Sequence, residues 1–161
     1  MAASRLIRPE AVADPQAIRA AALALLARRD WLTGELSAKL QAAGCDREAA
    51  AAVIADLVQE RLLNDARYAE RYVASRADRG RGPLRIAADL ASLGAPRELI
   101  EAALGSGPDW CAVAGEVRRR KFGAAPPDSW AEKARQARFL QYRGFSSDHI
   151  RAATGADLDR D

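Results

Sequence analysis

Apolar residues recur along this chain at intervals of three and four, the spacing that gathers side chains on one face of an α-helix. Three such stripes follow one another before residue 60, and short polar segments separate them. Their members are Ile18, Ala22, Leu25 and Leu26, then Leu36, Leu40 and Ala43, then Val53, Ile54, Leu57 and Val58. The pattern predicts three amphipathic helices in this part of the chain.

The same plan returns twice further along the sequence, again as three stripes in succession. The apolar positions of the second set are Tyr68, Ala69, Tyr72 and Val73, then Ile86, Leu90 and Leu93, then Leu99, Ile100, Ala103 and Leu104. Those of the third set are Trp110, Val113 and Val117, then Trp130, Ala134, Ala137 and Leu140, then a short stretch through Ile150. Each set therefore predicts three further helices.

A recurring Leu-x-x-x-Gly motif gives this arrangement its period. The three glycines, Gly44, Gly94 and Gly144, lie 50 residues apart. Glycine is favoured just past a helix end because it adopts the left-handed backbone conformation without a side-chain clash. Recurrence at one fixed interval predicts three tandem repeats, and stacked repeats are expected to form an elongated body.

The expected fold class is all-α, because alanine is abundant and the clusters of Val, Ile and Thr that mark strands are absent. The expected segments are a flexible N-terminal segment at 1–15, three-helix repeats at 16–63, 64–107 and 108–155, and a polar tail at 156–161. The expected helix starts are Thr33, Asp46, the Gly82-Pro83 pair, Pro96, and either Ser146 or Ser147.

Positive charge is concentrated in two zones, although the formal net charge is only +3. Residues 67–85 hold six arginines against two acids, and residues 116–151 hold nine basic residues against four acids. The segment between them, 86–115, has one arginine against four acids. Arginine binds carboxylates and phosphates through two parallel hydrogen bonds. The two zones therefore predict an anionic partner surface, either an acidic protein or a nucleic-acid backbone.

The polar residues offer little for catalysis. Cys45 and Cys111 have no Cys or His at metal-ligand spacing, so we expect two buried free thiols rather than a metal site or a disulfide. His149 is the only histidine, and its neighbours Ser147 and Asp148 share its turn, so the three cannot converge as a catalytic triad. We therefore expect no enzymatic activity, no metal and no cofactor.

The N-terminal residues predict no secretory signal, because residues 1–15 contain several charges and no apolar run. The longest apolar stretch, at residues 20–27, is far shorter than the roughly 20 residues that span a bilayer. We expect a cytoplasmic protein with no membrane role.

Three separate segments resemble the RecX family. The central one reads Leu62-Leu63-Asn64-Asp65-Ala66-Arg67-Tyr68-Ala69-Glu70-Arg71-Tyr72-Val73, followed by Arg81-Gly82-Pro83-Leu84-Arg85-Ile86-Ala87-Ala88-Asp89-Leu90. Asn64 stands where the family usually has the first residue of an acidic pair. The other two are Trp31-Leu32-Thr33-Gly34-Glu35-Leu36 with Lys39-Leu40, and Phe139-Leu140 with Arg143-Gly144-Phe145. The likeness spans about residues 16 to 155 and implies tandem three-helix units in a curved rod.

The resemblance also implies a function. RecX proteins bind the RecA recombinase filament on single-stranded DNA and suppress its ATP hydrolysis, strand exchange and coprotease role. If the chain acts in this way, the basic zones are the best candidates for the contact. The candidate contact residues are Arg67, Arg71, Arg76, Arg79, Arg81, Arg85, Arg118, Arg119, Arg120 and Lys121, whereas Tyr68 and Tyr72 are expected to be mostly structural.

Two other functions remain open on the sequence alone. A three-helix unit resembles a helix-turn-helix DNA-binding domain, but the alanine-rich stretch 47–63 lacks an outward set of residues suited to base edges. Non-specific phosphate contact by the arginines is still compatible with filament binding. A structural adaptor is the remaining alternative, and no small-molecule substrate is expected.

Overall fold

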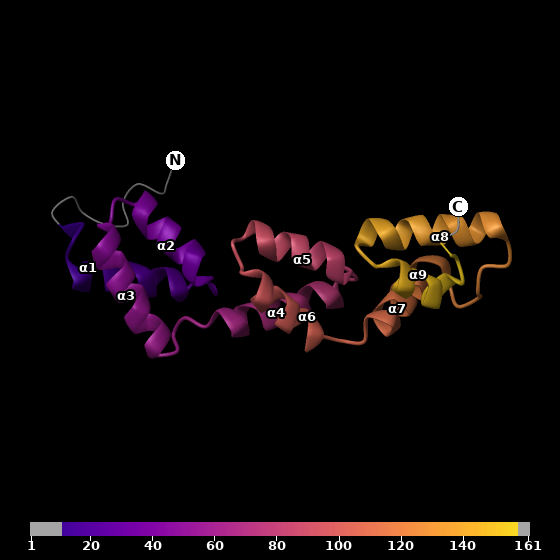
Figure 1. The fold of residues 1–161 in the computed structure, drawn as a ribbon, viewed down its shortest axis with the longest axis horizontal. Helices are drawn as coiled ribbons and strands as arrows, with labels where there is room; N and C mark the ends of the chain where they lie inside the picture. Colours follow the sequence, from indigo (N-terminus) through magenta and orange to yellow (C-terminus); the bar gives the residue numbers. More distant parts are fainter. Residues whose placement is uncertain (1–10, 158–161) are drawn as a thin grey trace. The chain divides into compact units, whose positions relative to one another are not determined.

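The computed structural model describes residues 11–157, and over this range it contains nine helices and no strand (Figure 1). The all-α prediction is confirmed. The helices are α1 (Pro15–Leu26), α2 (Thr33–Ala42), α3 (Arg47–Gln59), α4 (Asp65–Asp78), α5 (Pro83–Ser92), α6 (Arg97–Gly105), α7 (Trp110–Phe122), α8 (Trp130–Arg143) and α9 (Ser147–Thr154).

The chain divides into two compact units. The first runs through Tyr68 and includes Leu93–Ala95, and the second comprises Ala69–Ser92 and the residues from Pro96 onward. Inside the first unit, α1, α2 and α3 enclose an apolar core around Ile18, Leu40 and Leu57, all fully buried. Inside the second unit, α7, α8 and α9 enclose another core, whose buried members are Ala114, Ala137, Leu140, Phe145, Ile150 and Ala156.

Burial follows the 50-residue period that the glycines indicate. The leucine of each Leu-x-x-x-Gly motif is fully buried, at Leu40, Leu90 and Leu140. The residue after each motif glycine is also buried, although its size changes from Cys45 to Ala95 to Phe145. Equivalent positions in the three repeats are therefore buried, as the stripes predict.

The motif glycines end α2, α5 and α8 in the conformation expected of them. Their φ angles are +95° at Gly44, +90° at Gly94 and +98° at Gly144, a region that favours glycine. The predicted cap of α3 is also present, because the Asp46 carboxylate accepts the Ala49 N–H at 3.0 Å.

The predicted cap of α2 is wrong. Thr33 is the first helical residue rather than the cap, and its N–H and hydroxyl both donate to Asp65 Oδ1, at 2.7 and 2.9 Å. A carboxylate 32 residues away in sequence therefore accepts the hydrogen bond that a local capping side chain was expected to accept. Glu35 does lie in the first turn, where it accepts the Leu32 N–H at 3.4 Å.

Within the second unit, the start of α5 is joined to the end of α8 through main-chain atoms. The Gly82 N–H donates to the Arg143 carbonyl at 2.8 Å, and the Leu84 N–H donates to the Gly144 carbonyl at 3.0 Å. Free N–H groups at one helix start thus meet free carbonyls at another helix end, an arrangement that also suits the two helix dipoles.

Some predictions fall outside the described residues or need correction. Of the predicted flexible segment 1–15, residues 1–10 lie outside the described part, and α1 already begins at Pro15. Of the predicted tail 156–161, residues 158–161 lie outside, while Ala156 is buried. Both cysteines are free, but only Cys45 is buried; the prediction of a buried thiol is wrong for Cys111, which is exposed.

Candidate functional site: a basic cleft with an aromatic floor

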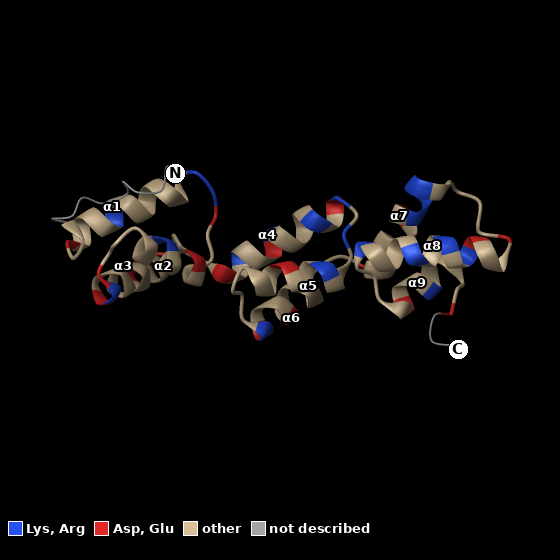
Figure 2. Cartoon of the chain, turned by 90° about the horizontal axis from the view of Figure 1, so that it is seen from above, with Lys and Arg blue, Asp and Glu red and all other residues tan. Residues whose placement is uncertain are grey.

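A cleft of about 480 Å³ lies in the second unit, where the turn after α4 meets α7 and α8. Lysines and arginines mark these three helices in Figure 2. Four of the eight residues that line the cleft are basic and one is acidic. The lining residues are Asp78, Arg79, Gly80, Val117, Arg120, Lys121, Phe139 and Arg143. The cleft therefore joins residues from both basic zones of the sequence.

Local structure explains how these side chains come together. Gly80, at φ +79°, turns the chain after α4, and a Cβ there would lie 3.1 Å from a methyl group of Val117. The absent side chain lets the turn approach α7 closely. Arg120 and Lys121 occupy the last turn of α7, where cations are favourable beside the free carbonyls of the helix end. Basic residues from both zones of the sequence therefore line the same cleft.

An aromatic ring forms part of the cleft wall, with cations around it. The Lys121 ammonium lies 5.7 Å and the Arg143 guanidinium 5.3 Å from the centroid of the Phe139 ring. The edge of Phe122 meets the same ring, with centroids 5.3 Å apart and planes at 88°. Cations near an aromatic face are attracted by its electron density. The arrangement can hold an anionic group beside a flat apolar surface.

Three of the cleft cations have charge available for a partner. Arg79, Lys121 and Arg143 form no ion pair with any residue in the described range, whereas Arg120 shares Glu116 with Arg119. The hydrogen bonds from Arg119 and Arg120 lower the pKa of the Glu116 carboxyl, so it stays ionised and neutralises part of their charge. The free positive charge of the cleft therefore comes chiefly from the three unpaired residues.

Arg118 points inward, unlike its neighbours in the predicted contact set. It is 6% exposed, and its guanidinium donates to the carbonyls of Ala124 and Ala125 at 3.4 and 3.1 Å and to the Gln136 side-chain oxygen at 3.4 Å. These bonds hold the loop between α7 and α8 against the core. Its position favours a structural role over partner contact.

The remaining arginines of the first zone do not line the cleft. Arg81 pairs with Asp89 at 2.8 Å. Arg85 donates to the Tyr142 carbonyl at 3.2 Å and lies over the Tyr142 ring at 5.4 Å. The others stand outside the cleft: Arg76 lies over the Tyr72 ring at 4.6 Å, Arg71 is exposed, and Arg67 is half-buried.

Phe139 and Arg143 were not among the candidate contact residues, although both line the cleft. One signal in the sequence could have identified them. They lie four residues apart on a helix, so they share a face, and a cation beside an aromatic ring at this spacing can form a cation–π contact. Their approach to Lys121 depends on how α7 packs against α8, which the spacing alone does not give.

Other kinds of site find little support over the range that the structure describes. No group of three or more His, Cys, Asp or Glu residues lies close enough to hold a metal ion there. Likewise, none of the described helices is both long and apolar enough to span a membrane.

Comparisons with known proteins match the two parts of the chain that supply the residues of this cleft. The family model described as RecX, second three-helix domain, matches residues 64–104, and the model described as RecX, third three-helix domain, matches residues 109–154. A regulatory protein RecX from Halorhodospira halophila is 45% identical over 91% of this chain and 92% of its own length. Another, from Pseudomonas savastanoi, is 43% identical over 88% and 92%. The chain belongs to the RecX family.

Solved RecX structures show the same fold. The crystal structure of RecX from Lactobacillus salivarius superposes with a TM-score of 0.77 at 24% identity, covering 87% of this chain and 94% of that one. A crystal structure described as regulatory protein RecX gives 0.70 at 22% identity, covering 89% and 73%. Tandem three-helix repeats are thus common to this chain and to RecX proteins of low sequence identity.

Proposed function

We propose that this RecX-family chain is a regulator that binds the RecA recombinase filament on single-stranded DNA and inhibits its ATPase, strand-exchange and coprotease activities. In this role it modulates DNA repair and recombination by binding rather than by catalysis. Membership of a family of regulatory proteins supports the proposal. The observation that carries it to particular residues is the cleft, where Arg79, Lys121 and Arg143 converge and form no ion pair with a residue in the described range.

Binding explains inhibition through two physical effects. A chain with three repeats can contact neighbouring protomers of one filament, and each further contact is favoured by the high effective concentration of a tethered group. A ligand that binds one filament conformation more tightly than another shifts the filament toward that conformation. ATP turnover requires the protomers to cycle, so holding them in one arrangement slows turnover.

The test is the ATPase rate of RecA on single-stranded DNA with increasing amounts of the chain. The wild type is expected to inhibit below one molecule per RecA. The double variant Arg79→Glu/Lys121→Glu is expected to need at least about tenfold more protein, because like charge facing an acidic surface costs several kcal/mol. The matched control, Arg47→Glu/Arg97→Glu, changes the same charge at exposed residues outside the cleft and should inhibit like the wild type.

Wild-type potency of the cleft variant would reject the cleft as the contact, and a wild-type chain inert toward RecA from the same source would reject the function. Non-specific DNA binding is the second candidate, favoured by the aromatic ring among cations, a combination that holds single strands in other proteins. It predicts binding to single-stranded DNA without RecA, with affinity falling steeply as salt increases.

A further inference from the structure

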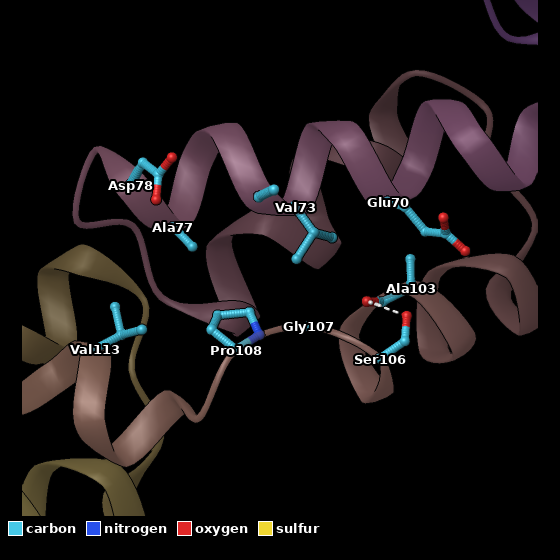
Figure 3. Close-up of a pocket in the computed structure, with 10 residues that line it drawn as sticks. Glu70, Val73, Ala77, Asp78, Ala103, Ser106, Gly107, Pro108 and Val113 are labelled. Atoms are coloured by element: carbon cyan, nitrogen blue, oxygen red, sulfur yellow. Dashed lines mark hydrogen bonds between the residues drawn. The ribbon is translucent and has the colours of Figure 1, made fainter.

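A second cavity of the second unit, also about 480 Å³, runs along α4 (Figure 3). Opposite α4 it is bounded by the end of α6, the loop that follows and the first turn of α7. Most of its lining is small and apolar. The lining residues are Glu70, Val73, Ala74, Ala77, Asp78, Ala103, Ser106, Gly107, Pro108 and Val113. We call this cavity the acidic groove, for the charges described next.

The charges of the acidic groove are opposite to those of its surroundings. Residues 67–85 contain only two acids, Glu70 and Asp78, and both line the groove. No lysine or arginine lines it, although the same stretch holds six arginines. Neither acid forms an ion pair with a residue in the described range, and both are exposed. The groove is therefore a negative site within a positive region.

The two carboxylates stand at opposite ends of an apolar floor. Figure 3 shows Glu70 and Asp78 at the two ends of the groove, with Val73 and Ala77 between them. The two acids are eight positions apart on the helix, which corresponds to a rise of about 12 Å. Gly107 lets the loop after α6 pack closely against α4, because a Cβ there would lie 3.2 Å from a Val73 methyl group and 3.3 Å from the Trp110 ring.

We propose that the acidic groove binds a short extended segment of a partner protein, in which an apolar side chain lies between two lysines or arginines. In an extended chain, residues i, i+2 and i+4 point to one side, and i and i+4 lie about 13 Å apart. Two cations at i and i+4 thus match the spacing of Glu70 and Asp78. The apolar residue at i+2 meets the apolar lining that stays accessible, which includes the exposed Ala74 and Pro108.

This inference goes beyond the proposed function, since the basic cleft needs an anionic partner and the acidic groove a cationic one. It is tested without RecA. The probe is a fluorescein-labelled peptide containing Lys-Ala-Leu-Ala-Lys, and fluorescence anisotropy measures its binding to the full chain. The control peptide contains Lys-Leu-Ala-Ala-Lys, which has the same composition and charge but turns the leucine to the other side of the extended chain.

The expected result is that the wild type binds the first peptide at least about tenfold more tightly than the control peptide, because only the first places leucine on the groove floor. The variant Glu70→Gln/Asp78→Asn should lose about tenfold in affinity for the first peptide. The matched control Glu48→Gln/Glu98→Gln removes the same charge from exposed acids outside the groove and should bind like the wild type.

A second variant tests the apolar floor separately from the charges. Ala74 lines the groove but is exposed, so Ala74→Phe should fill the groove and abolish binding while the helical circular dichroism stays unchanged. Equal binding of the two peptides, wild-type affinity of the charge variant, or no saturable binding up to about 1 mM peptide would overturn the proposal. So would displacement of the peptide by spermidine at equal affinity, which would indicate a site for small cations instead.

Discussion

The starts of α2 and α5 are equivalent in the 50-residue period, yet they satisfy their free N–H groups in different ways. At α2, the carboxylate of Asp65 accepts both the N–H and the hydroxyl of Thr33, at 2.7 and 2.9 Å. At α5, the equivalent residue is Pro83, which has no N–H to satisfy. The N–H groups on either side of Pro83 donate instead to main-chain carbonyls at the end of α8.

The difference shows which parts of a repeat protein tolerate substitution. A side-chain acceptor such as the Asp65 carboxylate can be replaced by another acceptor of similar length. A main-chain acceptor needs close approach of two backbones, and at α5 the two backbones come so close that there is no room for a Cβ on either side. The residues at this contact are Gly82 and Gly144, where a Cβ on either would overlap atoms of the other helix end.

The largest expected effect is that of Gly144→Ala, measured against Gly44→Ala. Both glycines have the same backbone conformation, with φ of +98° and +95°. A Cβ at Gly144 would lie 2.7 Å from the backbone nitrogen of Arg85, whereas nothing lies within 4 Å at Gly44. We expect Gly144→Ala to lower the free energy of unfolding by about 3 kcal/mol or more, and Gly44→Ala by about 1 to 2 kcal/mol.

Urea unfolding followed by circular dichroism measures both variants. Because the conformational cost is shared, the excess loss at Gly144 reports the close contact with Arg85. Equal losses would mean that the two helix ends are not held differently.

A smaller loss is expected for Asp65→Ala, which removes the acceptor of the Thr33 N–H and hydroxyl. The cost should be about 1 to 2 kcal/mol in the free energy of unfolding, the range for a lost helix cap. Asp65→Asn keeps an acceptor oxygen at the same place, so its melting temperature should stay close to that of the wild type. If alanine and asparagine are equally destabilising, the hydrogen bonds to Thr33 contribute nothing and the charge of Asp65 matters instead.

The smallest expected effect concerns pH and the caps of the third helices. Asp46 caps α3, and at the equivalent start of α9 Ser146 donates its N–H to His149 Nδ1 at 3.2 Å. That bond needs an unprotonated Nδ1, and burial also lowers the pKa of the His149 ring. The unfolded state therefore binds the proton more readily, so stability should fall as the pH drops through the ordinary histidine value of about 6.5.

The measurement is the urea midpoint at about pH 7.5 and about pH 5.5. The effect should be smaller than that of losing the Asp65 cap, because the ring stays partly exposed. His149→Gln should remove this pH dependence, and an unchanged pH profile in that variant would rule His149 out as its source.

Much of the fold was predictable from the sequence because the repeat signals are local. Leucine one turn before glycine reports both a buried face and a helix end, so Leu40, Leu90 and Leu140 were identified correctly as core. The cap of α2 was not predictable, because its acceptor, Asp65, lies 32 residues away. Cys111 was misplaced because a helical pattern alone does not say which face of α7 packs inward.

The candidate site was predictable only in part. Charge counts identify two basic zones in the sequence, but which of their members share a cleft depends on the packing of α4, α7 and α8. Arg118 illustrates the limit, since it belongs to a run of four cations and yet points to the loop carbonyls of Ala124 and Ala125. One feature of the sequence does indicate that Arg118 is buried. This residue follows the buried Ala114 by four residues, which places both on one helical face.

The main-chain contact between Gly82 and the end of α8 also bears on how such a protein can gain or lose repeats. A chain that stopped before α8 would leave the N–H groups of Gly82 and Leu84 without their acceptors, so the second repeat is completed by residues of the third. The smallest block that can be duplicated, fused or expressed with these hydrogen bonds intact is consequently the second and third repeats together. Its inner boundary is closed by backbone contact, so neither Gly82 nor Gly144 can gain a side chain without loss of that contact.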